Sequence, residues 1–183
     1  MNTVHTLREY VDALRDAGIL VESTVSDELA AREIHCLTYD TRALSEDALF
    51  ICKGAHFKEE YLRDALSRGA FAYVAEQQHD VDAPCILVSD IRYSLVVLGQ
   101  LFYDHVTDKL TSIGITGTKG KSTTAYYVRY ILNDWLRAQD RNECAILSSI
   151  DNYDGKVSEE SHITTPEVLE LYQHFENAHE SGI

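Results

Sequence analysis

Residues 114–123 read GITGTKGKST, and an apolar run at residues 110–115 leads into them. Glycine at positions 117 and 120 lets the backbone curl so that several N–H groups point at one anion. The segment that follows has the apolar spacing of a helix from about residue 121 to 139, and a helix N-terminus favours negative charge. A strand, a glycine-rich turn and a helix in this order predict a phosphate-binding loop.

The residues at the end of this stretch have the chemistry that nucleotide phosphates require. Lys121 would neutralise charge on the β- and γ-phosphates of ATP, and the Ser122 hydroxyl would reach Mg²⁺ or a phosphate oxygen. The generic pattern G-x-x-x-x-G-K-[ST] has glycine where this chain has Ile115, so the stretch predicts a variant loop. A short glycine-rich motif can also be a turn without a ligand. The helix after the loop favours nucleotide binding, because its apolar residues fall on one side: Ala125, Val128, Ile131, Leu132, Trp135 and Leu136.

Strands and helices alternate on both sides of the loop, which predicts an α/β fold with a largely parallel sheet. We place a small domain at residues 1–106 and the beginning of a P-loop domain at residues 107–183. The expected helices cover residues 7–14, 58–68, 91–102, 121–139 and 166–180, and the expected strands cover residues 34–39, 48–52, 71–75, 85–88, 110–115 and 144–148.

The composition of the chain limits the classes of molecule that it can bind. The chain has 16 Lys and Arg against 30 Asp and Glu, a net charge of −14, which argues against a nucleic-acid or acidic-membrane surface. No apolar run is long enough to span a membrane and no signal peptide begins the chain, so we expect a cytoplasmic protein. Cys36, Cys52 and Cys85 lie in apolar, strand-like runs without metal-binding spacing, which predicts buried reduced thiols.

Three separated segments resemble the Mur ligase superfamily, which builds the peptide of the bacterial cell wall. Residues 117–123, GTKGKST, resemble its ATP loop. Residues 39–42, YDTR, and 47–54, DALFICKG, look like the signature of an N-terminal domain that holds the UDP end of the substrate. Residues 164–167, TTPE, are similar to a segment of the third ligase, which acts on UDP-N-acetylmuramoyl-L-alanyl-D-glutamate. The resemblance covers nearly the whole chain.

The resemblance implies ATP-dependent amide formation. ATP would phosphorylate the terminal carboxylate of the UDP-linked dipeptide, and the amine of an amino acid would displace the phosphate. In this family the glycine-rich loop holds ATP and Mg²⁺. The lysine of the loop is the catalytic cation, and the serine after it faces the metal ion. The implied ATP-binding residues are Gly117, Thr118, Lys119, Gly120, Lys121, Ser122 and Thr123, and the implied substrate-binding residues are Thr41, Arg42, His56, Thr164 and Thr165.

Some of these residues have a second, structural interpretation. Thr164 and Glu167 also fit a helix capping box, and Pro166 suits a first helical turn. Arg42 can instead pair with a nearby carboxylate such as Asp47. Departures from the family pattern are Thr41, where serine is usual, and Lys119, where asparagine is commoner.

Two other functions are alternatives to this ligase activity. One is a folylpolyglutamate-synthase-like ligase, whose loop usually reads GTNGKGS. The other is a non-catalytic module that binds the UDP substrate and ATP. In the superfamily the metal-binding glutamate, the carbamylated lysine and the amino-acid-binding domain follow the segments found here, so we expect this chain alone to be inactive as a ligase.

Overall fold

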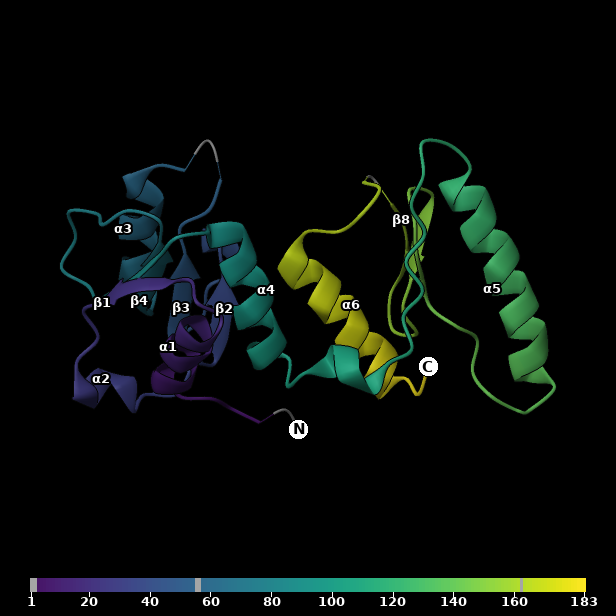
Figure 1. Cartoon of the computed structure of the whole chain (residues 1–183), viewed down its shortest axis with the longest axis horizontal. Coiled ribbons are helices and arrows are strands. Elements are labelled where there is room, and N and C mark those ends of the chain that lie inside the picture. Colours follow the sequence, from purple (N-terminus) through teal and green to yellow (C-terminus); the bar gives the residue numbers. More distant parts are fainter. Residues whose placement is uncertain (1–2, 55–56, 162) are drawn as a thin grey trace. The chain divides into compact units, whose positions relative to one another are not determined.

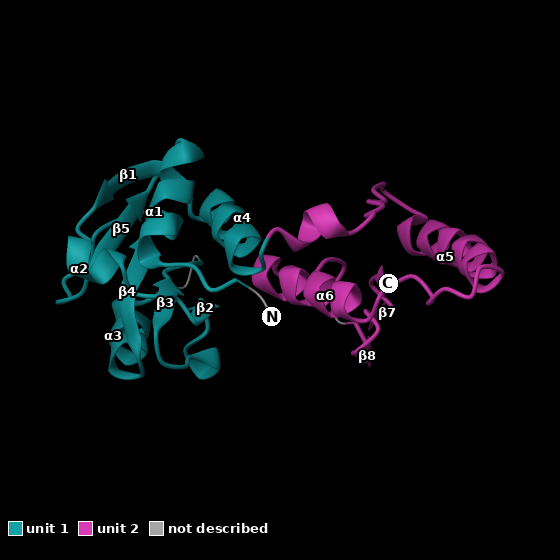
Figure 2. Cartoon of the chain, turned by 90° about the horizontal axis from the view of Figure 1, so that it is seen from below, with its two compact units in different colours: residues 1–104 teal, residues 105–183 magenta. Residues whose placement is uncertain are grey.

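The computed structural model describes residues 3–54, 57–161 and 163–183. Helices and strands alternate along the chain, which confirms the predicted α/β class (Figure 1). The chain divides into two compact units, residues 1–104 and residues 105–183 (Figure 2). Among the described residues, no helix is both long and apolar enough to cross a lipid bilayer.

The first unit is built on a five-stranded sheet with the order β1-β5-β4-β3-β2. The four strands β2 to β5 are parallel, so their carboxyl ends share one edge, and β1 pairs with β5 in the antiparallel direction. The strands are β1 (Leu20–Ser23), β2 (Cys36–Thr38), β3 (Ala48–Ile51), β4 (Ala70–Ala75) and β5 (Cys85–Val88).

Helices cover both faces of this sheet. Helices α1 (Leu7–Asp16) and α4 (Ile91–Phe102) pack together on one face, and α3 (Glu59–Ser67) lies on the other (Figures 1 and 2). Every residue of β3 is buried as a result, because side chains on both of its faces meet a helix layer. The unit also contains a short helix α2 (Asp27–Ala30) and a 3-10 turn η1 (Thr41–Ala43).

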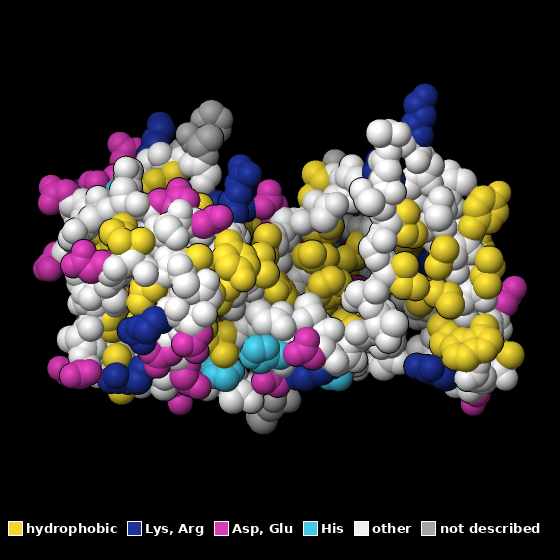
Figure 3. All heavy atoms as spheres, viewed as in Figure 1, with side chains coloured by type: hydrophobic (Ala, Val, Ile, Leu, Met, Phe, Trp, Pro, Cys, Tyr) yellow, Lys and Arg dark blue, Asp and Glu magenta, His cyan; other side chains and the backbone are white. Residues whose placement is uncertain are grey.

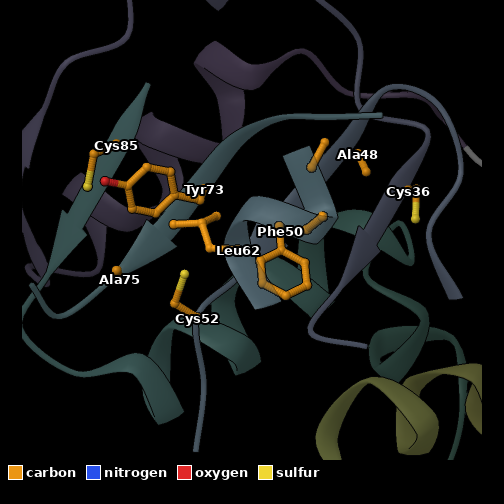
Figure 4. Packing of buried hydrophobic residues seen from close by; sticks show 10 residues of the cluster. Cys36, Ala48, Phe50, Cys52, Leu62, Tyr73, Ala75 and Cys85 are labelled. Carbon is orange, nitrogen blue, oxygen red and sulfur yellow. The ribbon is translucent and has the colours of Figure 1, made fainter. Parts of the chain in front are cut away.

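Three cysteines belong to the core between the sheet and α3. Phe50 of β3, Leu62 of α3 and Tyr73 of β4 pack with them (Figure 4). Cys36, Cys52 and Cys85 are all buried and unbridged, which confirms the prediction of buried reduced thiols. Burial raises the pKa of the Cys52 thiol, so this side chain stays protonated and packs as a small apolar group.

The second unit combines two helices with a small antiparallel sheet. Strands β6 (Ile146–Leu147), β7 (Asp151–Tyr153) and β8 (Ser158–Glu160) pair in sequence order. Helix α5 (Lys121–Arg137) precedes them and α6 (Val168–Glu180) follows them, so the predicted final helix is confirmed to within two residues at its start. A 3-10 turn η2 (Val106–Lys109) lies against α6.

Two predictions for this unit were wrong. Residues 110–115 form no strand, and Ile113 is 59% exposed. A strand requires a hydrogen-bonded neighbour, and the described strands of the unit pair only with one another. The predicted apolar side of α5 is also not buried as a whole, since Ile131 is 70% and Trp135 55% exposed. Hydrophobic side chains gather over α5 on the face shown in Figure 3.

Candidate functional site

The glycine-rich loop ends at a sharp backbone turn immediately before α5. Gly120 has a φ of +76°, a left-handed conformation that favours glycine, and it is the N-cap of the helix. The amide of Thr124 donates to the carbonyl oxygen of Gly120 at 2.9 Å, which closes the first helical turn. The N–H groups at the start of α5 have no acceptor within the helix, so they are available to an anion.

Two side chains from the start of α5 point back to defined partners. Lys121 Nζ donates to the carbonyl oxygen of Gly117 at 2.9 Å, which keeps the ammonium against the loop. Ser122 Oγ lies 2.9 Å from Ser149 Oγ. The structure therefore brings Lys121 to Gly117 and Ser122 to Ser149. Lys121 and Ser122 are partly buried, while Gly117, Thr118, Lys119, Gly120 and Thr123 are exposed.

Ser149 is a residue of this site that the sequence did not indicate. It lies in the turn between β6 and β7, where the buried Ser148 Oγ donates to the carbonyl of Asp151 at 3.0 Å and accepts the amide of Ile150 at 3.1 Å. Tyr126 of α5 donates its hydroxyl to the Asp151 carboxylate, which ties this turn to the helix. No motif marks Ser149, because its contact joins residues 27 positions apart.

The two threonines before α6 do not cap that helix. Glu167 is the N-cap, and it forms a capping box with Glu170, so the capping interpretation of Thr164 was wrong. Because the helix begins at Val168, Thr164 lies too far upstream to reach its first amides. Both Thr164 and Thr165 are exposed, and neither hydroxyl has a hydrogen-bond partner within residues 163–183 or the rest of the described chain.

In the first unit, the predicted substrate residues follow β2 at the carboxyl edge of the sheet. Asp40 caps η1 by accepting the amide of Arg42 at 2.9 Å, and the Arg42 guanidinium donates to the same carboxylate at 3.0 and 2.7 Å. These hydrogen bonds from Arg42 hold the pKa of Asp40 below its usual value. Arg42 thus pairs with a carboxylate, but the partner is Asp40, because Asp47 binds Arg32 instead.

Thr41 is held at the same place by its backbone. Its carbonyl oxygen accepts a hydrogen bond from Arg68 Nη1 at 3.3 Å, and its side chain is partly exposed. His56, the remaining predicted substrate residue, lies outside the described residues.

A family model and curated proteins match this chain. Residues 115–183 match the Mur ligase middle domain. A UDP-N-acetylmuramoyl-L-alanyl-D-glutamate–L-lysine ligase from Enterococcus faecalis is 42% identical over 162 residues, which cover 87% of this chain and 31% of the relative. The protein of the same name from Streptococcus agalactiae serotype V is 40% identical over 140 residues, 76% of this chain and 28% of the relative. The chain therefore spans less than a third of the length of these relatives.

Solved structures also align with this chain. A UDP-N-acetylmuramoyl-L-alanyl-D-glutamate–2,6-diaminopimelate ligase aligns with a TM-score of 0.66 at 17% identity, over 98% of this chain and 34% of that one. MurF from Acinetobacter baumannii aligns with a TM-score of 0.52 at 22% identity, over 73% of this chain and 28% of that one. At these identities the alignments show a common fold.

Proposed function

Because the chain belongs to the Mur ligase superfamily, we propose that it is part of a ligase that joins an amino acid to UDP-N-acetylmuramoyl-L-alanyl-D-glutamate with the use of ATP. The observation that carries this proposal is the geometry of residues 117–122. A left-handed glycine, a helix start and a lysine folded against the loop converge where a triphosphate would bind.

The residues of the loop fit ATP and Mg²⁺ in both charge and geometry. The amides at the start of α5 and the Lys121 ammonium would contact the phosphates, and the Ser122 hydroxyl would face the metal ion. Lys121 already lies on the loop side of the helix, so a change of acceptor from the Gly117 carbonyl to a phosphate oxygen needs only a side-chain movement. Catalysis by this site would consist of positioning and electrostatic stabilisation of the transferred phosphoryl group.

The family resemblance implies substrate-binding residues in each unit, and His56 is one of them. Thr41 and Arg42 would recognise the UDP end at the carboxyl edge of the first sheet, where α/β proteins place ligands. Thr164 and Thr165 would contact the sugar-peptide part. Their hydroxyls are exposed and not used for capping α6, which supports a role in binding.

The amino acid that we propose is L-lysine. The Enterococcus and Streptococcus relatives are L-lysine ligases by name, and their identity to this chain exceeds that of the diaminopimelate ligase structure. The product would be a precursor of peptidoglycan, and the reaction would take place in the cytoplasm, where ATP and UDP-linked sugars are available.

Ligand-dependent thermal unfolding tests the proposal against its alternatives. A ligand that binds only the native state raises the melting temperature. We expect a rise with Mg²⁺-ATP and with UDP-N-acetylmuramoyl-L-alanyl-D-glutamate, and no rise with dihydrofolate derivatives. A shift with the folate compounds alone would indicate a folylpolyglutamate-synthase-like protein, and no shift with either family ligand would contradict the proposal.

A further inference from the structure

One face of α5 holds four polar side chains that contact the segment after the helix. They follow one another at spacings of four, three and four residues, which places them on one side of the helix: Ser122, Tyr126, Arg129 and Asn133. At the end away from the glycine-rich loop, Asn133 Oδ1 accepts the amide of Cys144 at 2.9 Å, and Arg129 Nε donates to the carbonyl oxygen of Cys144 at 3.3 Å. Because hydrogen bonds are directional, these contacts limit the rotation of α5 about its own axis.

The contacts nearest the glycine-rich loop come from the turn between β6 and β7. Tyr126 donates its hydroxyl to the Asp151 carboxylate, and Ser122 Oγ lies 2.9 Å from Ser149 Oγ. Ser148 holds the turn together from inside, because its buried hydroxyl accepts the amide of Asp151 at 3.2 Å and donates to the carbonyl oxygen of the same residue at 3.0 Å. The turn therefore holds Ser149 in place beside Ser122.

A serine hydroxyl that ligates Mg²⁺ needs a second partner. Its oxygen gives a lone pair to the metal ion, so its O–H group must point to an acceptor elsewhere. In the proposed ATP site, Ser122 is the residue whose hydroxyl would face Mg²⁺. The Ser149 oxygen is an acceptor within hydrogen-bond distance of that hydroxyl. A group that orients a metal ligand in this way raises the affinity of the site for the metal.

We propose that Ser149 is a positioning residue of the ATP site, which accepts a hydrogen bond from the Ser122 hydroxyl and so directs the Ser122 oxygen at Mg²⁺. This inference rests on the proposed function and adds a residue that lies outside the glycine-rich motif. In this role Ser149 acts through Ser122. Because the Ser149 side chain is exposed, its substitution should leave the packing of the unit unchanged.

Calorimetric titration of the 183-residue chain with Mg²⁺-ATP and with ATP in excess EDTA tests the inference. Ser149→Ala removes the acceptor and should weaken Mg²⁺-ATP binding about three- to tenfold, while the affinity for metal-free ATP should stay the same. Ser149→Thr keeps a hydroxyl and should bind Mg²⁺-ATP as the unaltered chain does. Ser158→Ala is the matched control, because it removes the hydroxyl of another exposed serine of the same unit, in β8, and should bind normally.

A double-mutant cycle separates this role from a merely structural one. In the Ser122→Ala background no hydroxyl remains for Ser149 to orient, so Ser149→Ala should cause no further loss of Mg²⁺-ATP affinity. A structural role of Ser149 would lower the affinity by the same factor in both backgrounds.

The outcomes also separate the inference from the proposed function. Equal Mg²⁺-ATP affinity in Ser149→Ala and the unaltered chain would overturn the role of Ser149 while ATP binding itself survives. An equal loss of affinity for Mg²⁺-ATP and for metal-free ATP would also overturn it, because the effect would then not come from the metal ion, and so would an additive loss in the double variant. Absence of Mg²⁺-ATP binding by the unaltered chain would overturn both.

Discussion

His174 Nδ1 of α6 lies 2.6 Å from Asp154 Oδ2, and both side chains are almost completely buried. Asp154 also accepts the amides of Lys156 and Val157 at 2.9 and 2.7 Å, and the side-chain amide of Asn177 at 2.9 Å. One carboxylate therefore joins the β7–β8 turn to the last helix.

Removal of this carboxylate should destabilise the second unit. Asp154→Ala leaves four hydrogen-bond donors without their acceptor, and two of them belong to the buried side chains of His174 and Asn177. Loss of one member of such a network costs about 3–5 kcal/mol. Urea unfolding followed by circular dichroism measures the change. The control is Lys156→Ala, which breaks an exposed ion pair between the same turn and Glu180 of the same helix. It should cost less than about 1 kcal/mol. Equal losses in the two variants would contradict the account.

The same carboxylate predicts a pH dependence of stability. Burial alone would raise the pKa of Asp154, but the donors from Val157, Asn177, His174 and Lys156 outweigh it and hold the pKa below the ordinary value of 3.8. A lowered folded-state pKa adds stability that is complete above the unfolded pKa and is lost as the pH falls through the folded value. The free-energy difference between the unaltered chain and Asp154→Asn should therefore shrink as the pH falls below about 3.8. A difference that does not change with pH would show that the carboxylate charge is not involved.

Much of the first unit could be predicted because its core pattern is local. The apolar runs of β3 and β4 and the helical spacing in α3 and α4 stand out in the sequence. Strand β1 was not predicted, since Leu20–Ser23 is short, contains Glu22 and is stabilised by its pairing with residues of β5 that lie 63 to 68 positions later. The expected strand at 110–115 was wrong for the opposite reason. Its residues have strand propensity, but the chain provides no neighbour among the described strands.

For the candidate site, the loop could be predicted and its surroundings could not. Gly120, Lys121 and Ser122 are consecutive, so their motif fixes their geometry. The contact of Ser122 with Ser149 and the engagement of Arg42 by Asp40 depend on side-chain packing, which residue spacing does not encode. The family roles of the ATP- and substrate-binding residues stay predictions.

The loop lysine gives a direct test of nucleotide binding. Lys121→Ala should weaken Mg²⁺-ATP binding at least about tenfold, because it removes a charge-assisted contact worth about 1.5–3 kcal/mol. The fold should survive, since Lys121 opens a helix and adds little to a core. Arg141→Ala removes an equal charge from an exposed position of the same unit and should bind as the unaltered chain does. Unchanged affinity in Lys121→Ala would exclude the phosphate-binding assignment.

The solvent exposure of α5 can be measured through the fluorescence of the one tryptophan of the chain. Trp135 is 55% exposed, so its emission should resemble that of an indole in contact with water, and acrylamide should quench it efficiently. Both properties should be independent of protein concentration. Blue-shifted emission with weak quenching would mean that α5 is covered in solution, and a dependence on concentration would identify a second copy of the chain as the cover.

The central claim, that this chain binds the UDP-linked dipeptide of a Mur ligase, is tested most directly by calorimetric titration of the 183-residue chain with UDP-N-acetylmuramoyl-L-alanyl-D-glutamate. We expect saturable binding with a dissociation constant below about 1 mM, a binding free energy of about −4 kcal/mol or stronger. We also expect weaker binding by Thr41→Val, which keeps the shape of the side chain but loses its hydroxyl. Absence of saturable binding by the unaltered chain would contradict the claim. Equal binding by Thr41→Val and the unaltered chain would contradict the assignment of Thr41.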